Sequence, residues 1–182
     1  LGSMGVIFRG QGPLGSFNWG GLDRVLISDR VSAAGRASDR VTRFEKSWIV
    51  LNHYYQNWPT PPPHNSDREL VRAFAGAFFT PHWSWVQKLH SMRRTLQVPF
   101  DAQRQNGTLL RVPRGLQATN VSERRAADLD APDFFEVAYQ LRCEDFHGRT
   151  GVRGSENEAR FAFVTEPVFE LVKAMAIGTT MS

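Results

Sequence analysis

The stretch AYQLRCEDFHG places an arginine, Arg142, five residues before a histidine, His147. A guanidinium binds phosphate through two parallel hydrogen bonds, and an imidazole that titrates near neutral pH can accept or donate a proton. A pair of this kind can therefore serve phosphate chemistry. On an ideal helix, five residues turn through about 500°, so the two side chains point about 140° apart. One pair alone makes a poor site, which favours a site built from two copies.

The spacing alone does not establish a function, because the chain contains 19 Arg and five His. An arginine four to six residues before a histidine is expected by chance in such a sequence. The interpretation therefore depends on the helices that would hold the pair and on the rest of the chain.

The composition indicates a soluble protein with one domain. The chain has 182 residues, of which 41% are hydrophobic and 22% charged, and these values are ordinary for folded soluble proteins. Its apolar runs are shorter than the roughly 20 residues that a membrane-spanning helix needs. Cys143 is the only cysteine, which excludes an internal disulfide and a multi-cysteine zinc site and indicates a reducing cytoplasm. We predict no membrane association, no metal and no cofactor.

The net charge of +4 is carried by 19 Arg against three Lys. Because guanidinium is the cation that binds phosphate in a bidentate manner, this bias is compatible with a nucleic acid as partner. Most of these arginines are equally well explained as solvated side chains on helix surfaces.

The first 16 residues differ from the rest of the chain. They contain LGSM and GQGPLGS, which resemble vector sequence and the scar of a protease site. We therefore interpret residues 1–16 as the remnant of an expression tag. Residues 17–182 are predicted to form a single helical domain.

Residues 22–58 show an almost continuous helical pattern that is interrupted at Gly35. In its second half, apolar residues at steps of three and four form one face: Val41, Phe44, Trp48, Leu51 and Tyr55. The opposite face carries polar residues: Arg40, Arg43, Lys46 and Gln56. This pattern predicts a long helix whose apolar face points to the core.

The remaining pattern predicts four further helices. A capping box begins at Ser66 and opens a helix to about Phe79, after which a second pattern runs from Pro81 to about 96. Residues 98–125 lack a sustained period and are predicted to be a long irregular insertion. Pro132 opens a helix that Gly148 ends, and the segment from Thr165 opens the last one. The sequence thus predicts an all-α bundle of five or six helices.

Two stretches, RFEKSWIVLNHYYQ at 43–56 and YQLRCEDFHG at 139–148, together resemble the HEPN superfamily, the higher eukaryotes and prokaryotes nucleotide-binding domain. Members of this family share an arginine followed after four to six residues by a histidine. The positions that match the family pattern are Trp48, Ile49, Asn52, Tyr55, Arg142, Phe146, His147 and Gly148. The likeness covers roughly residues 39–177, but only the two stretches are specific.

The resemblance implies a metal-independent endoribonuclease that cleaves single-stranded RNA. In this interpretation two protomers form a homodimer, Arg142 holds the scissile phosphate and His147 moves the proton of a ribose 2′-hydroxyl. The resemblance also implies a toxin or anti-phage effector that a protein inhibitor or an activating partner controls. One residue departs from the pattern: Cys143 stands where active members often have Asn, Asp or His, and a thiol is a weak hydrogen-bond partner.

Several residues near the motif have two interpretations each. Glu144 and Asp145 either orient His147 or form an exposed acidic turn. Arg149 and Arg153 either contact the RNA backbone or are solvated.

Asn52 either supports the motif across the core or is a hydrogen-bonded core amide.

Two other interpretations of the whole chain also remain open. A HEPN-type domain can serve as a non-catalytic RNA-binding or scaffolding module, which Cys143 favours, and an unrelated helical protein could carry the motif by accident.

Overall fold

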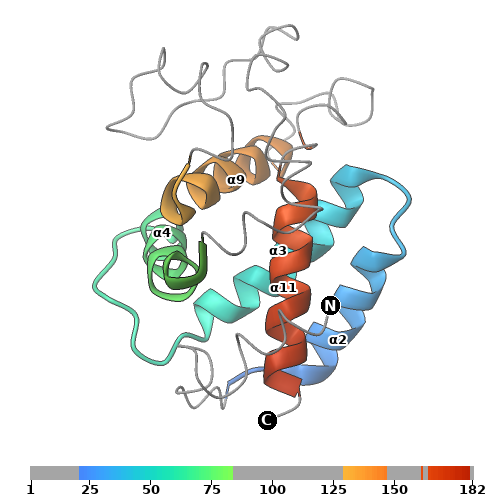
Figure 1. The fold of residues 1–182 in the computed structure, drawn as a ribbon, viewed down its shortest axis with the longest axis horizontal. Helices are drawn as coiled ribbons and strands as arrows, with labels where there is room; N and C mark the ends of the chain where they lie inside the picture. The colour runs from blue at the N-terminus through green and yellow to red at the C-terminus, as the bar shows by residue number, and fades with distance from the viewer. Residues whose placement is uncertain (1–20, 84–128, 147–160, 162–163, 181–182) are drawn as a thin grey trace, which may run out of the picture.

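The computed structural model describes residues 21–83, 129–146, 161 and 164–180, and the described part is helical (Figure 1). It contains five α-helices and one short 3-10 helix, and no strand occurs among these residues. The elements are α2 (Arg24–Gly35), α3 (Arg40–Gln56), α4 (Asp67–Phe78), η2 (Thr80–His82), α9 (Ala131–Phe146) and α11 (Thr165–Thr180). The prediction of an all-α protein is confirmed. The predicted insertion at 98–125 lies outside the described residues.

Short polar side chains fix where the helices begin. Asp23, Asp39 and Asp130 each accept a hydrogen bond from a backbone amide three residues later, at 2.8–2.9 Å. The Ser66 hydroxyl accepts from the Glu69 amide, as the predicted capping box requires. The Glu69 carboxylate, however, accepts from the Asn65 amide, one residue before the amide that the motif normally uses.

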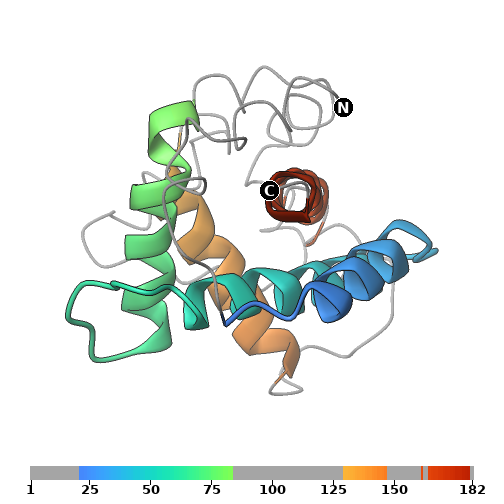
Figure 2. The ribbon, with the colours of Figure 1, turned by 90° about the horizontal axis from the view of Figure 1, so that it is seen from below.

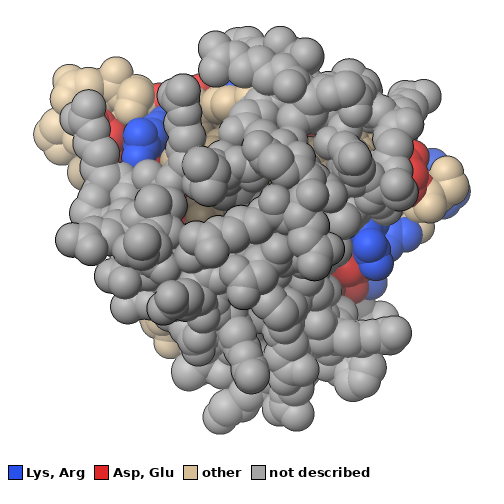
Figure 3. All heavy atoms as spheres, turned by 90° about the horizontal axis from the view of Figure 1, so that it is seen from above, with Lys and Arg blue, Asp and Glu red and all other residues tan. Residues whose placement is uncertain are grey.

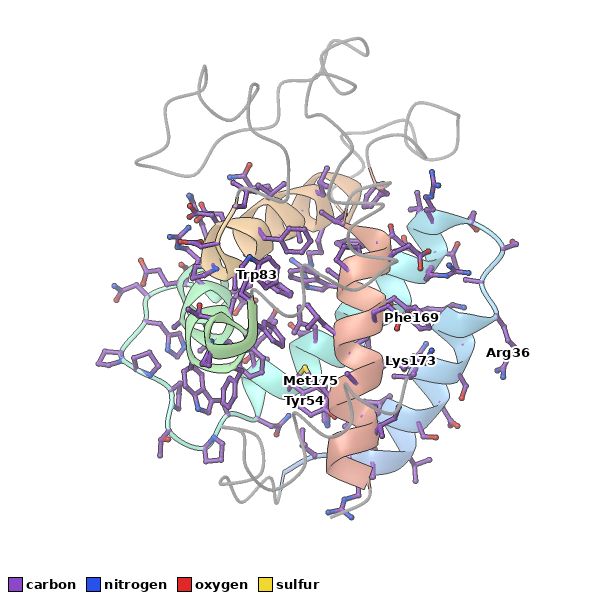
Figure 4. The ribbon with its side chains drawn as sticks, in the orientation of Figure 1. Arg36, Tyr54, Trp83, Phe169, Lys173 and Met175 are labelled. Atoms are coloured by element: carbon purple, nitrogen blue, oxygen red, sulfur yellow. The ribbon has the colours of Figure 1, made fainter. Side chains whose placement is uncertain are left out.

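Helix α3 lies at the centre of the described helices. Figure 2 shows α2 running beside α3, α11 seen end-on, and α9 crossing α3. Helix α4 packs against α9. The five apolar residues predicted to face the core from α3 are all buried. The core is rich in aromatic rings, and Phe74, Phe78 and Trp58 pack with ring centroids 4.5–5.8 Å apart. Trp83 is also buried between α4 and α9, where its indole N–H donates to the Leu129 carbonyl at 2.7 Å (Figure 4).

Arg43, predicted to lie on the polar face of α3, instead joins three helices. Its guanidinium forms an ion pair with Glu166 of α11 at 2.5 Å and donates to the carbonyls of Ala34 and Ala37 at 3.3 and 3.2 Å. The same guanidinium lies 5.6 Å from the centre of the Phe169 ring. In Figure 4, Phe169 and Lys173 lie on the side of α11 that faces α2. Arg43 therefore holds the end of α2 and the start of α11 against α3.

A buried carboxylate joins α4 to α9. Glu136 of α9 is 2% exposed and forms ion pairs with both Arg68 and Arg72 of α4. Arg72 also pairs with Asp133 at 3.0 Å. A carboxylate at this depth needs compensating cations, because desolvation of an unpaired charge is costly. These four residues therefore fix how α4 lies on α9.

We predict that Glu136→Ala lowers the free energy of unfolding by about 2–3 kcal/mol, because it leaves two guanidinium groups with one carboxylate between them. The cost stays below that of a fully buried pair because Arg68 and Arg72 are 37% and 36% exposed. Glu170→Gln is the control, since its pair with Lys173 spans 3.9 Å, and it should change the free energy by less than about 0.5 kcal/mol. Urea denaturation measures both, and equal effects would contradict the proposed role of Glu136.

Candidate functional site

The structure describes the side chains of three predicted site residues: Asn52, Arg142 and Cys143. Glu144 and Asp145 belong to the last turn of α9, within the helix that the sequence predicted. The positions of His147, Arg149 and Arg153 lie outside the described residues. The structure therefore describes the surroundings of Arg142 and not those of His147.

Arg142 is half-buried near the end of α9 and is held by residues of its own helix. Its guanidinium carbon lies 6.0 Å from the centre of the Tyr139 ring, and its Nη1 donates to Cys143 Sγ at 3.8 Å. Residues three and four apart share one face of a helix, so Tyr139 lies beside both Arg142 and Cys143. Cys143 is thus an acceptor for the arginine that the motif depends on.

The stretch at 139–148 contacts the stretch at 43–56 where α9 crosses α3. The rings of Trp48 and Tyr139 lie 6.2 Å apart between centroids. On the same helix α3, the Tyr55 hydroxyl donates a hydrogen bond to Asn52 Oδ1. Asn52 is therefore a hydrogen-bonded amide, and its partner Tyr55 is one of the residues whose pKa the charge of Arg142 affects. We call Asn52, Tyr55, Tyr139, Arg142 and Cys143 the Arg142 cluster.

The positive charge of Arg142 affects the pKa of both tyrosines in the Arg142 cluster. Burial raises the pKa of Tyr55 well above its usual range and the Asp67 carboxylate adds to this rise, whereas the positive charge of Arg142 opposes it. Burial also raises the pKa of Tyr139 to about 12, with a further rise from its hydrogen bond to Cys143 and an opposing effect of Arg142. Both phenols are therefore neutral at physiological pH and sit within the field of one guanidinium.

Tyr139 is the member of the cluster that sequence reasoning missed. Its distance of three residues from Arg142 was visible in the sequence and is the spacing at which side chains on a helix meet. Asp67, at the start of α4, was also missed, because only the folded chain brings that helix near the two phenols.

Several of the described charges lie beside neighbours of opposite sign. Figure 3, a view of one face of the molecule, shows described Lys and Arg side chains beside Asp and Glu side chains at two edges of the face. The ion pairs of Arg43, Arg68 and Arg72 are examples. Among the described residues, no three His, Cys, Asp or Glu side chains group as metal ligands would. None of the described helices has both the length and the apolar character of a membrane span.

No family model matches this chain, and neither characterised proteins nor solved structures gave a significant match. The resemblance to the HEPN superfamily therefore rests on the two stretches that form the Arg142 cluster.

The raised pKa of Tyr139 predicts a loss of stability at alkaline pH. A tyrosine with an unfolded pKa near 10.0 and a folded pKa of about 12 keeps its proton longer in the folded protein. Its contribution is complete below pH 10 and is lost as the pH rises towards 12. We expect the urea midpoint to fall across this range, and to fall less steeply in Tyr139→Phe. An identical pH dependence in the variant would show that Tyr139 titrates normally.

Proposed function

We propose that this protein is a metal-independent endoribonuclease of the HEPN type that cleaves single-stranded RNA. The observation that carries the proposal is the contact between the two family-like stretches at the Arg142 cluster, where α9 crosses α3. In the sequence these stretches are separated by the whole of α4 and by residues 84–128. Trp48 of the first stretch packs against Tyr139 of the second, which brings the two stretches together in the folded chain.

Arg142 is suited to bind the scissile phosphate. Its guanidinium is half-buried, and a partly desolvated cation stabilises negative charge more strongly than one in bulk water. Its contacts with Tyr139 and Cys143 restrict the side chain before RNA binds. Less conformational entropy is then lost when the phosphate arrives.

In the proposed reaction, His147 accepts the proton of a ribose 2′-hydroxyl, whose oxygen attacks the neighbouring phosphorus. A new P–O2′ bond forms and the P–O5′ bond breaks. The leaving 5′-oxygen receives a proton from a second imidazole, which gives a 2′,3′-cyclic phosphate and a 5′-hydroxyl end. The second imidazole and a second guanidinium come from the other protomer of a homodimer. DNA is not cleaved, because it lacks the attacking hydroxyl.

The biological role proposed with this activity is that of a cytoplasmic toxin or anti-phage effector. A ribonuclease that acts on single-stranded RNA is harmful to its own cell when uncontrolled. We therefore propose that a protein inhibitor or an activating partner regulates it.

A second candidate is a non-catalytic RNA-binding or scaffolding module. One observation favours it: an Arg142 N–H already donates to Cys143 Sγ, and its guanidinium packs on Tyr139 within the protein. In that case the arginine stabilises the end of α9 and does not bind a scissile phosphate.

The two candidates differ in the cleavage of labelled single-stranded RNA in excess EDTA. We expect cleavage by the wild-type protein and a loss of about 10²-fold or more in both Arg142→Ala and His147→Ala. Arg36→Ala is the matched control, because Arg36 is exposed and points away from the bundle at the turn after α2 (Figure 4). Cleavage that persists in both motif variants contradicts the enzyme proposal, whereas RNA binding without cleavage favours the module.

The composite site requires two chains. We expect sedimentation equilibrium to give twice the chain mass of 20.6 kDa, at protein concentrations where cleavage is observed. The specific activity should fall on dilution as the dimer dissociates. An active monomer would contradict the composite site.

A further inference from the structure

Among the residues that the structure describes, two arginines lie over aromatic rings. Arg43 lies over Phe169 at 5.6 Å and Arg142 lies over Tyr139 at 6.0 Å, measured from the guanidinium carbon to the ring centre. The first contact joins helices, since Arg43 also forms an ion pair with Glu166. The second lies within one helix, where it contributes little to the way the helices pack together. The contact between Arg142 and Tyr139 is therefore not explained by helix packing.

Tyr139 is itself held firmly from two directions. Its ring packs against Trp48, which is 1% exposed, and belongs to the partly buried edge of the core. Its hydroxyl forms a hydrogen bond with the thiol of Cys143, which also accepts from Arg142 Nη1. Tyr139, Arg142 and Cys143 thus form a closed set of contacts on one face of α9. Through Trp48, this set is anchored to the buried side of α3.

We propose that Tyr139 is a positioning residue that sets the orientation of the Arg142 guanidinium for phosphate binding. This inference deepens the proposed ribonuclease function and rests on it. An aromatic ring contacts the flat face of a guanidinium, whereas the N–H donors point outward in its plane. The contact with Tyr139 therefore does not compete with a phosphate for those donors. Trp48 transmits the rigidity of the core to the arginine through the Tyr139 ring.

The ring, rather than the hydroxyl, carries this role. A guanidinium interacts with the face of either a tyrosine or a phenylalanine ring. The hydroxyl adds the hydrogen bond to Cys143, which steadies the ring but does not touch the guanidinium. Tyr139→Phe should therefore preserve the function that Tyr139→Leu removes.

The test compares the cleavage kinetics of single-stranded RNA by full-length variants in EDTA. Tyr139→Leu should lower kcat roughly tenfold and change KM less than about twofold, because transition-state contacts are lost while most RNA contacts remain. Tyr139→Phe should stay within about twofold of the wild-type kcat. The matched control is Phe169→Leu, which removes the ring beneath Arg43 and should keep kcat while it lowers stability.

A second measurement does not depend on activity. In protein labelled with ¹⁵N-arginine, the Nε–H resonance of Arg142, assigned with Arg142→Lys, should carry a ring-current shift. That shift should disappear in Tyr139→Leu and remain in Tyr139→Phe.

Each failure has a distinct signature. An unchanged kcat in Tyr139→Leu, or a Tyr139→Phe variant as slow as Tyr139→Leu, overturns the positioning role while the ribonuclease proposal stands. An Arg142 resonance that Tyr139→Leu leaves in place also overturns it. A wild-type protein that does not cleave RNA overturns the proposed function itself, and the positioning role falls with it.

Discussion

The proposed site depends on one constraint, the placement of the Arg142 cation where α9 crosses α3. Arg142 is half-buried, and its positive charge acts on the phenols of Tyr55 and Tyr139, whose pKa values burial raises. Its guanidinium contacts the Tyr139 ring and donates to Cys143 Sγ. A cation in such a setting is partly desolvated, so it attracts an anion more strongly than a solvated side chain does. This is the physical basis of the proposed phosphate site.

Contacts remote from Arg142 hold that crossing in place. On one side, Glu136 binds Arg68 and Arg72 and so fixes α4 on α9. On the other side, Arg43 joins α3 to α2 and α11 through Glu166 and the carbonyls that end α2. The aromatic core fills the space between these two sets of ion pairs.

The helical class and most helix starts could be predicted from the sequence because they depend on local chemistry. The apolar period of α3, the cap at Ser66 and the start of α11 at Thr165 are all as expected. The ion pairs could not be predicted, since Glu136 and its arginines lie on helices whose contact depends on the whole fold. The ion pair of Arg43 with Glu166 could not be predicted for the same reason. Within the site, Asn52 had two interpretations, and the structure shows its hydrogen bond with Tyr55. The roles of Arg142, His147, Arg149 and Arg153 stay predictions.

The most direct test of the account is the chemical identity of the RNA ends that the protein makes. Mass spectrometry of the products of a single-stranded RNA oligonucleotide, incubated in EDTA, distinguishes the possible reactions. The account predicts a 2′,3′-cyclic phosphate on one fragment and a 5′-hydroxyl on the other, and an uncleaved bond wherever the attacking ribose is replaced by 2′-deoxyribose. A 5′-phosphate end, or cleavage next to a 2′-deoxyribose, would contradict it.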